Sequence, residues 1–354
     1  MTVKKIKCKN FRNLKNINIE PAESMNIICG ENAQGKTNLL EAIWLFCGAK
    51  SFKNAKDSEL INFNAQFFEN EISFICEGIE KTAKIRNENT REAYLNNKKL
   101  KSPSLLAGSF YCVCFNPDDL SLVKEGPNLR RKFLDIAIGQ LNPNYISLLK
   151  IYTRAIKQRN DILKKVYKDA SLLPIIEEFE IKAAETGEKI TEYRKNYIKT
   201  LLLSAPEIYN GISGGKESLT IEYMPSYYGV NLLEALNNSR KKDILAGATS
   251  VGPHRDDIIF KINGKNARDF ASQGQQRSIA LSLKLSEAKI IFEKTGEYPV
   301  ILLDDVMSEL DESRQNYILN NIKGRQVFLT CCEENNFKNL YEGKIIKIKN
   351  GECF

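Results

Sequence analysis

The first 50 residues change their pattern of hydrophobic and polar positions twice. Near the start, apolar Val3, Ile6 and Cys8 alternate with lysines, the period of a strand with one solvated face. Residues 25–29 are a continuous apolar run that ends at a glycine, as a buried strand would. Residues 37–47 then show helical spacing before Gly48, with apolar side chains at Leu39, Leu40, Ile43, Trp44 and Cys47. The pattern predicts a strand, a glycine-rich turn and a helix.

The middle of the chain passes from strands to long helices. Residues 67–100 alternate as short strands do, and the pair Asn96-Asn97 suits a hairpin turn. From about residue 128 to 204 the apolar positions follow two helical faces: Leu148, Tyr152, Ile156, Leu163 and Val166, and then Ile176, Phe179, Ala183, Ile190, Tyr193 and Tyr197. A turn at 168–174 would join two helices of about 25 residues into an antiparallel arm some 35–40 Å long. Such an arm is too short for a chromosome-bridging coiled coil.

The last third returns to alternating strands and helices. Strands are expected at 218–223 and 258–262, and Asn263-Gly264 after the second is a strong hairpin signal. A helix is expected from 275 to about 294. Apolar strands at 299–303 and 326–330 flank a helix near 312–322. The whole pattern predicts an α/β protein.

Composition narrows the class of protein. The chain has 354 residues, 42% hydrophobic and 27% charged, which is typical of a folded globular protein with one composite or two cooperating domains. Its apolar runs are too short to span a membrane, and its first residues do not read as a secretory signal, so a cytoplasmic location is expected. The nine cysteines form no zinc-type or disulfide framework. Cys29, Cys76, Cys112 and Cys114 sit in apolar runs and are interpreted as core residues.

The segment GENAQGKT, Gly30 to Thr37, fits the phosphate-loop pattern G-x-x-x-x-G-K-[ST] and lies between the predicted strand and helix. Backbone N–H groups of such a loop cradle phosphates, Lys36 would reach the β and γ oxygens, and the Thr37 hydroxyl would ligate Mg²⁺. The motif predicts an ATP site.

A second acidic element is PVILLDD at 299–305, an apolar strand that ends in two carboxylates. Asp304 would hold Mg²⁺, and Asp305 would act as general base beside the attacking water. Two aspartates at a strand end can also form a turn or a helix cap.

A third element, ASQGQQR at 271–277, opens a helix after a loop. Ser272 and the amides that follow would face an anion at the positive end of that helix. Taken alone, Ser272 is equally an ordinary N-cap. Its place about 30 residues before the carboxylate strand is where ABC-type ATPases carry the signature that serves the nucleotide of the opposite subunit.

Seven segments in order resemble the RecF family of ABC/SMC-like ATPases. GPHRDD followed by a strand pair and SQGQQR discriminates best, because generic ABC and SMC proteins lack it. The segments are NFRNL at 10–14, ENAQGKTNLLEAI at 31–43, GPNLRRKFLD at 126–135, KQRNDILK at 157–164, GPHRDD at 252–257, SQGQQR at 272–277 and LLDDVMSELD at 302–311.

The resemblance implies an SMC/Rad50-like ATPase head with a second lobe. The ATP-binding lobe would comprise 1–112 and 295–354, and the second lobe, 113–294, would carry the helical arm and the signature. It implies a homodimer in the ATP state, weak DNA-stimulated ATP hydrolysis, and binding to double-stranded DNA and single-strand/duplex junctions. The partner proteins RecR and RecO are implied in the same way.

The resemblance also implies roles for individual residues. Asp305, Lys36 and Ser272 would be catalytic, Thr37 and Asp304 would bind Mg²⁺, and the D-loop would be 308–311. The residues expected to bind ATP are Arg12, Gly30, Glu31, Asn32, Ala33, Gln34, Gly35, Lys36, Thr37, Asn38, Ser272, Gly274 and Gln275.

Three departures from the wider ABC pattern limit this transfer. The loop NPDDL at 116–120 stands where transporter ATPases keep a glutamine that senses Mg²⁺. After the last strand the chain reads LTCCEE at 329–334 instead of carrying a switch histidine, which makes Thr330 the candidate. Gln273 replaces the first glycine of the signature, as in RecF-like sequences.

Two other classes of protein stay open at this stage. An ABC transporter ATPase subunit would normally lack a helical hairpin of this size, and the short arm argues against an SMC-like structural clamp. An ATPase assay with and without gapped DNA separates the three.

Charge and the single histidine leave further alternatives. The net charge of +8 suits DNA or simply solubility. His254 is interpreted as structural or DNA-facing. The basic clusters that could meet DNA are Lys4, Lys5, Lys7 and Lys9, then residues 130–132 and 240–242.

Overall fold

A computed structural model describes residues 1–48, 50–53, 55–166, 169–332 and 343–354. The chain forms two compact units. Unit 1 comprises Met1–Asp119, Gly211–Gly215 and Ala280–Phe354, and unit 2 comprises Leu120–Asn210 and Lys216–Ile279. Each unit is described by itself.

The first sheet of unit 1 is antiparallel, with strand order β2-β1-β4-β5-β6-β7. Along β1 the apolar Val3, Ile6, Cys8 and Phe11 are buried, as the alternation with lysines predicts. Asn96 and Asn97 have positive φ of 48° and 63° at the predicted hairpin turn. The strands are β1 (Thr2–Phe11), β2 (Leu14–Ile19), β4 (Phe68–Cys76), β5 (Ile79–Asn87), β6 (Arg91–Leu95) and β7 (Lys98–Lys99).

The second sheet of unit 1 has the order β15-β14-β3-β13-β12-β8 and is parallel except for its β15 edge. Every residue of β3 is buried. The interpretation of residues 25–29 as a continuous apolar run is wrong at Asn26, whose buried side chain bonds the backbone of Ala22 and Val327. Because the strands are parallel, β3, β13, β12 and β8 end at one edge of the sheet. The strands are β3 (Met25–Cys29), β8 (Cys112–Phe115), β12 (Val300–Leu303), β13 (Val327–Cys331), β14 (Gly343–Lys349) and β15 (Glu352–Cys353).

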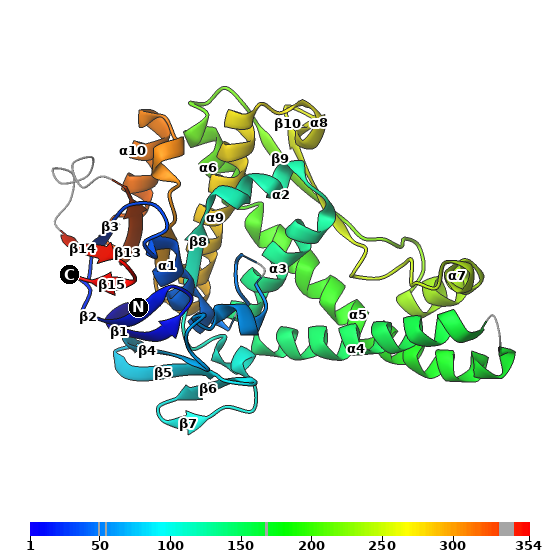
Figure 1. Ribbon diagram of the computed structural model, residues 1–354. Coiled ribbons are helices and arrows are strands. Elements are labelled where there is room, and N and C mark those ends of the chain that lie inside the picture. The colour runs from blue at the N-terminus through cyan, green and yellow to red at the C-terminus, as the bar shows by residue number, and fades with distance from the viewer. Residues whose placement is uncertain (49, 54, 167–168, 333–342) are drawn as a thin grey trace. The chain divides into compact units, whose positions relative to one another are not determined.

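Helix α1 (Lys36–Trp44) contacts β1 of the first sheet and β13 of the second (Figure 1). Its apolar face is fully buried, and a 3₁₀ turn extends it to Cys47 before Gly48, whose φ of 79° ends the helix as predicted. Helix α10 (Glu312–Asn321) precedes β13. Two helices, α6 (Ala205–Ile212) and α9 (Gln273–Thr295), contribute residues to both units.

Unit 2 is built on the predicted helical arm. Helices α4 (Pro143–Val166) and α5 (Leu173–Leu201) lie side by side along their length (Figure 1), and the first residue of the expected turn, 168, lies outside the described residues. The other helices are α2 (Ser121–Lys124), α3 (Pro127–Leu141), α7 (Leu232–Ala246) and α8 (Ala267–Phe270). A small sheet of order β11-β10-β9 completes the unit, with β9 (Leu219–Met224), β10 (Asp257–Ile262) and β11 (Lys265–Asn266).

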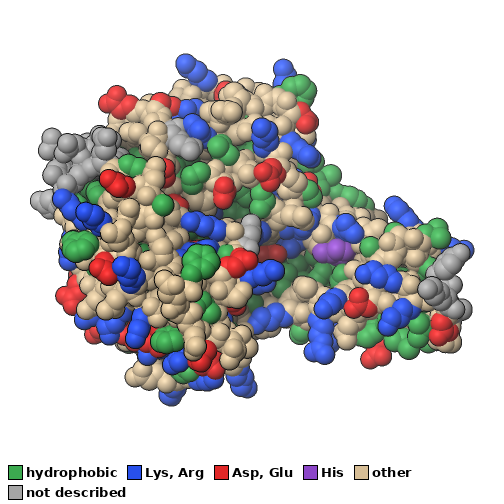
Figure 2. Space-filling view, in the orientation of Figure 1, with side chains coloured by type: hydrophobic (Ala, Val, Ile, Leu, Met, Phe, Trp, Pro, Cys, Tyr) green, Lys and Arg blue, Asp and Glu red, His purple; other side chains and the backbone are tan. Residues whose placement is uncertain are grey.

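Charged side chains of both signs intersperse over the face drawn in Figure 2. Several lysines and arginines of the expected DNA-binding clusters are paired within the chain. Arg130 is buried against Asp257, and Lys7 bonds Glu71 at 2.9 Å. The suggestion that Arg130 contacts DNA is therefore wrong. Among the described helices, the structure shows none long and apolar enough to cross a membrane.

Candidate active site

The phosphate loop, Gly30 to Thr37, connects the end of β3 to the start of α1 in unit 1. Its two glycines are required because neighbouring atoms lie too close for a side chain at either position. A Cβ on Gly30 would lie 2.4 Å from the backbone oxygen of Ile348, and one on Gly35 would lie 2.7 Å from Leu14 Cδ2. Gly35 also has φ of 116°, which side chains rarely adopt. The loop therefore packs tightly against the backbone of Ile348 and the side chains of Leu14 and Asn13.

Asparagines brace this loop from the outside. Asn13 Nδ2 donates to the carbonyl of Ala33 at 2.7 Å, and Asn38 Nδ2 donates to Asn13 Oδ1 at 2.8 Å. Gln34 Oε1 accepts from the backbone of Asn350 at 2.5 Å. Ala33 has φ of 64°, so the loop contains a second left-handed residue. Asn38 and Gln34 thus hold the loop in shape through their side chains.

The side chain of Lys36 folds back over the phosphate loop. Its Nζ donates to the carbonyls of Gly30 and Glu31 at 2.5 and 3.0 Å. It also lies 3.6 Å from Cys332 Sγ, whose thiol is 3.3 Å from Asn32 Oδ1. The first turn of α1 contains no acidic residue. A helix N-terminus together with this ammonium group suits a polyphosphate.

The predicted Mg²⁺ ligands meet at the end of the parallel strands. Thr37 Oγ1 donates to Asp304 Oδ1 at 2.8 Å, and Thr330 Oγ1 donates to the same oxygen at 3.1 Å. Burial raises the pKa of Asp304, and the two hydroxyl groups oppose that shift. A hydroxyl and a carboxylate oxygen are the hard ligands that Mg²⁺ prefers. The residues fit the ion.

Asp305 is exposed and has φ of 54°, a left-handed conformation that Asp and Asn adopt more readily than other side chains. Its N–H donates to Thr330 Oγ1 at 2.8 Å. Ser308 Oγ donates to its carbonyl at 2.8 Å and to its Oδ1 at 3.0 Å. Thr330, the candidate switch residue, thus contacts both aspartates. Glu333 and Glu334 of that segment lie outside the described residues.

Arg12 bonds a carboxylate of the helix that follows the phosphate loop. Its Nε and Nη2 donate to the two carboxylate oxygens of Glu41 at 2.5 and 3.0 Å, and Ser51 Oγ donates to Glu41 at 2.5 Å. Glu41 is completely buried in α1. Sequence analysis missed Glu41, although a carboxylate within the apolar face of a predicted helix is a signal for a buried ion pair.

The loop at 116–120 follows β8, beside the strand that carries Asp304. The N–H of Asp304 donates to the carbonyl of Phe115 at 2.9 Å, and the N–H of Asn116 donates to Asp119 Oδ2 at 2.8 Å. Asn116 Oδ1 is buried with no hydrogen-bond partner among the described residues.

The signature segment belongs to unit 2, and its serine caps α9. The N–H of Gln275 donates to Ser272 Oγ at 3.2 Å, and the N–H of Ser272 donates to Gln275 Oε1 at 2.8 Å. Gln275 Nε2 also donates to Glu217 at 2.7 Å. Ser272 and Gln273 are exposed and Gly274 is half-buried. The interpretation of Ser272 as an N-cap is therefore confirmed.

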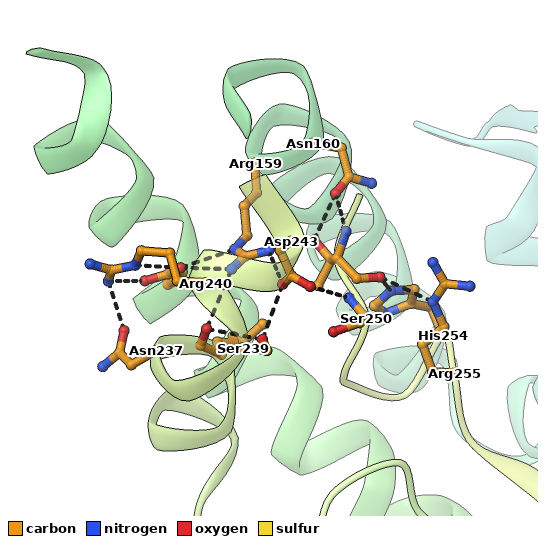
Figure 3. A network of polar contacts seen from close by, with 12 residues as sticks. Arg159, Asn160, Asn237, Ser239, Arg240, Asp243, Ser250, His254 and Arg255 are labelled. Atoms are coloured by element: carbon orange, nitrogen blue, oxygen red, sulfur yellow. Dashed lines mark hydrogen bonds and ion pairs between the residues drawn. The ribbon is translucent and has the colours of Figure 1, made fainter. Parts of the chain in front are cut away.

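A second polar cluster, here called the Arg159 cluster, lies within unit 2 (Figure 3). Arg159 of α4 is fully buried and bonds Glu180 of α5 and Asp243 of α7, each at 2.8 Å. Its Nη1 also donates to Thr249 Oγ1 at 2.8 Å. The cluster joins three helices to the segment before GPHRDD. Arg159 lies in KQRNDILK, a segment quoted above only for its resemblance to the RecF family.

His254 belongs to the same region and its contacts support the structural alternative. Its Nδ1 lies 2.5 Å from the hydroxyl of Tyr152, and its Nε2 lies 3.2 Å from the carbonyl of Thr249. The same carbonyl accepts from Nε of Arg255, which lies beside His254 in Figure 3. Burial lowers the pKa of His254 to about 4. The ring is neutral, with Nε2–H as donor and Nδ1 as acceptor.

Comparisons with known proteins identify the family. The profile of the RecF/RecN/SMC N terminal domain matches residues 2–352. The DNA replication and repair protein RecF of Agathobacter rectalis is 37% identical, covering 99% of this chain and 98% of that protein. RecF of Clostridium tetani is 39% identical, covering 100% and 99%.

Solved structures agree. A structure of the recombination mediator protein RecF with ATP, in the RecFOR pathway, has a TM-score of 0.92 and 39% identity over 100% of this chain and 97% of that one. The Smc head domain of Pyrococcus furiosus has a TM-score of 0.55 at 17% identity over 99% and 95% of the two chains, a likeness of fold alone. The chain belongs to the RecF family of DNA replication and repair proteins, with an SMC/ABC-type ATPase head fold.

Proposed function

We propose that this chain is an ATP-dependent DNA-binding protein of recombinational repair and replication in which ATP acts as a switch. The observation that carries the proposal is the hydrogen bond of 2.8 Å between Thr37 and Asp304. The two residues are 267 positions apart in the sequence, yet their side chains meet. A Mg²⁺ site needs oxygen ligands of this kind close together.

The side chains divide the chemistry of hydrolysis among them. Lys36 and the loop N–H groups bind and orient the phosphates of ATP. Thr37 and Asp304 would hold Mg²⁺, which when bound supplies positive charge beside the phosphates. Asp305 is exposed at the same strand end and takes the proton of the attacking water. Thr330 bonds both aspartates and positions them relative to each other.

We infer that hydrolysis is slow. Faster ABC ATPases usually carry glutamate where this chain has Asp305, and aspartate is one methylene shorter. A general base contributes about 10²–10⁴-fold, and imperfect placement forfeits part of that factor. Slow hydrolysis suits a timer that holds a dimer on DNA better than it suits a motor.

Two copies share each ATP in this proposal, because a signature serine serves the nucleotide of the opposite copy. Ser272 is exposed at the N-terminus of a helix of 23 residues, where amide groups favour an anion. Residues 308–311, the expected D-loop, would lie at the interface between the two copies.

Light scattering with ATP tests this dimer through Ser272→Arg. The variant is expected to bind ATP and stay monomeric. Ser272→Ala is the matched control, because both variants lose the cap, worth about 1 kcal/mol, and only arginine adds bulk and charge. A Ser272→Arg protein that dimerises as the wild type does removes the signature from the proposal.

DNA is bound mainly through its phosphates in this proposal, since no base-reading module such as a helix-turn-helix is recognised in the sequence. Lys241 and Lys242 of α7 are exposed, whereas the neighbouring Arg240 bonds Glu180. Affinity should fall steeply between 50 and 200 mM salt, by roughly 10³-fold or more if six phosphates are contacted, and vary little with sequence. Equal affinity at both salt concentrations contradicts phosphate binding.

An ATPase assay with and without gapped DNA tests the proposal as a whole. We expect slow hydrolysis that gapped DNA stimulates and that Lys36→Met abolishes. A transporter ATPase subunit would not respond to DNA, and a purely structural clamp would not turn over. RecR and RecO are the proposed protein partners, and the cytoplasm is the proposed location.

A further inference from the structure

The strand that leads into the phosphate loop, β3, and its neighbour in the sheet, β13, end in two cysteines that face each other. Cys29 is the last residue of β3, directly before Gly30, and Cys331 is the last residue of β13, directly after Thr330. The two residues are Cα partners in the parallel ladder, and their sulfurs lie 3.0 Å apart. Neither cysteine forms a disulfide in the structure.

This geometry is compatible with a disulfide. Neighbouring strands are about 4.7–4.9 Å apart, within the range of about 4.4–6.8 Å between the Cα atoms of disulfides. In-register residues project to the same face of a sheet, so the two Cβ atoms already point the same way. Closing the bond needs the sulfurs to approach by about 1 Å, to roughly 2.05 Å. We propose that Cys29 and Cys331 form a redox modification site at which a hydroperoxide closes a disulfide and slows ATP hydrolysis.

The reaction balances with the peroxide as oxidant. One sulfur, as thiolate, attacks the O–O bond of ROOH and becomes a sulfenic acid, releasing ROH. The second thiol displaces the hydroxyl of that sulfenic acid as water and forms the S–S bond. Two thiols are oxidised by two electrons, and the peroxide is reduced to ROH and water.

The surroundings make the reaction slow and dependent on pH. The hydrogen bond with Cys29, together with burial, raises the pKa of Cys331, so little thiolate is present at neutral pH. The rate of closure should therefore rise with pH. Cys332 next to the pair is exposed, 3.6 Å from Lys36 Nζ, and is the competing target for peroxide.

The disulfide would act on the residues beside it. Thr330, one residue before Cys331, bonds Asp304 at 3.1 Å and the N–H of Asp305 at 2.8 Å. Gly30, one residue after Cys29, is packed so closely on Ile348 that its backbone has little room to yield. The shift of backbone that brings the two sulfurs together should therefore displace Thr330 and, through it, Asp304 and Asp305. A misplacement of about 1 Å near reacting groups can cost up to about 10²-fold in rate.

Peptide mass mapping of the full chain, after peroxide treatment and alkylation of the remaining thiols, tests the site directly. We expect a peptide pair joined through Cys29 and Cys331, formed faster at pH 9 than at pH 7 and released by dithiothreitol. Absence of this pair under conditions that oxidise Cys332 overturns the proposal.

The effect on hydrolysis rests on the proposed function and is measured separately. Peroxide should lower ATP hydrolysis roughly 10- to 100-fold in the wild type and in Cys332→Ser, reversibly with dithiothreitol. Cys29→Ala should keep its rate under peroxide, and Cys331→Val is the second variant if Cys29→Ala folds poorly. Equal inhibition of Cys29→Ala assigns the effect to another thiol. A reduced wild type without ATPase activity contradicts the proposed function and leaves the cross-link measurable.

Discussion

The ATP centre of unit 1 and the Arg159 cluster of unit 2 use the same kinds of side chains in opposite ways. At the ATP centre, the ammonium group of Lys36 bonds backbone carbonyls of its own loop, and the carboxylate of Asp305 is exposed. In the Arg159 cluster, a guanidinium with no exposed surface meets two equally buried carboxylates. The first arrangement leaves charge available to a ligand. The second uses its charges to hold helices together.

Geometry explains why the Arg159 cluster can be buried at all. Nε, Nη1 and Nη2 of Arg159 each donate to a protein acceptor, and Asp243 Oδ1 accepts the N–H of Ser250 at 3.0 Å. A buried ion pair offsets its desolvation only when such additional hydrogen bonds are made. The cluster therefore fixes how α4, α5 and α7 pack, and it has no group left for chemistry.

The largest expected effect in this comparison is on stability. Arg159→Met leaves Asp243 buried without its cation and Glu180 with Arg240 alone, so unit 2 should lose about 3–5 kcal/mol. Arg240→Met is the matched control, because Arg240 also bonds Glu180 but keeps 22% of its side chain exposed, and it should cost about 1 kcal/mol or less. Urea unfolding of both variants checks this. Equal stability losses would show that burial of Arg159 does not set its contribution.

Lys36→Met should impair hydrolysis and leave the stability of the fold almost unchanged, the reverse of Arg159→Met. Removing this charge should lower the hydrolysis rate by about 10²–10³-fold or more, since it removes a donor aimed at the phosphates. The stability should change by less than about 0.5 kcal/mol, because the side chain is not part of a buried ion pair. An ATP hydrolysis assay checks the rate, and urea unfolding of the same preparation checks the stability. A large loss of stability would make Lys36 structural.

The two regions also differ in how far the sequence reveals them. The phosphate loop was recognisable because its glycines, Lys36 and Thr37 are fixed by local geometry. The mostly apolar sequences of β3 and β12 reflect the full burial of both strands. Arg159, Glu180 and Asp243 come from three helices, and neither spacing nor composition pairs residues 21 and 84 positions apart.

Some elements also escaped prediction for a physical reason. Helix α7 was missed because NNSRKKD interrupts its apolar face, which is decided by contact with α5 and α4. No strand was predicted at 343–349, although KIIKIK is a short alternating run, and such a run does not reveal which strand it pairs with. The structure pairs it in parallel with β3, from the other end of the chain.

A smaller effect is expected from pH through His254. Its pKa is lowered to about 4, so the folded chain resists a proton that the unfolded chain accepts below about 6.5. Stability from this group is present above pH 6.5 and is lost as pH falls toward 4, by about 2 kcal/mol at pH 5. Tyr152, Arg255, Arg131 and Arg159 are the polar or charged groups that face or influence the ring.

Urea midpoints at pH 7 and pH 5 for the wild type and His254→Gln isolate this contribution. The comparison with His254→Gln is needed because a second group also titrates in this range. Burial raises the pKa of Glu287 to about 7, so protonation of Glu287 stabilises the folded state as pH falls, opposite to the effect of His254. The wild type should lose about 2 kcal/mol more than His254→Gln between the two pH values. Parallel pH dependence of the two proteins would show that His254 does not titrate there.

The most direct test of the central claim, that the ATP centre is a slow switch operated by two aspartates with separate roles, is single-turnover hydrolysis together with dimer lifetime. Asp305→Asn keeps the shape and tolerates the φ of 54° at this position. It should bind ATP, dimerise and hydrolyse about 10²–10⁴-fold more slowly. Asp304→Asn should instead weaken Mg²⁺ binding and reduce dimer formation. Hydrolysis by Asp305→Asn at the wild-type rate would show that another group activates the water, and the account of this site would be wrong.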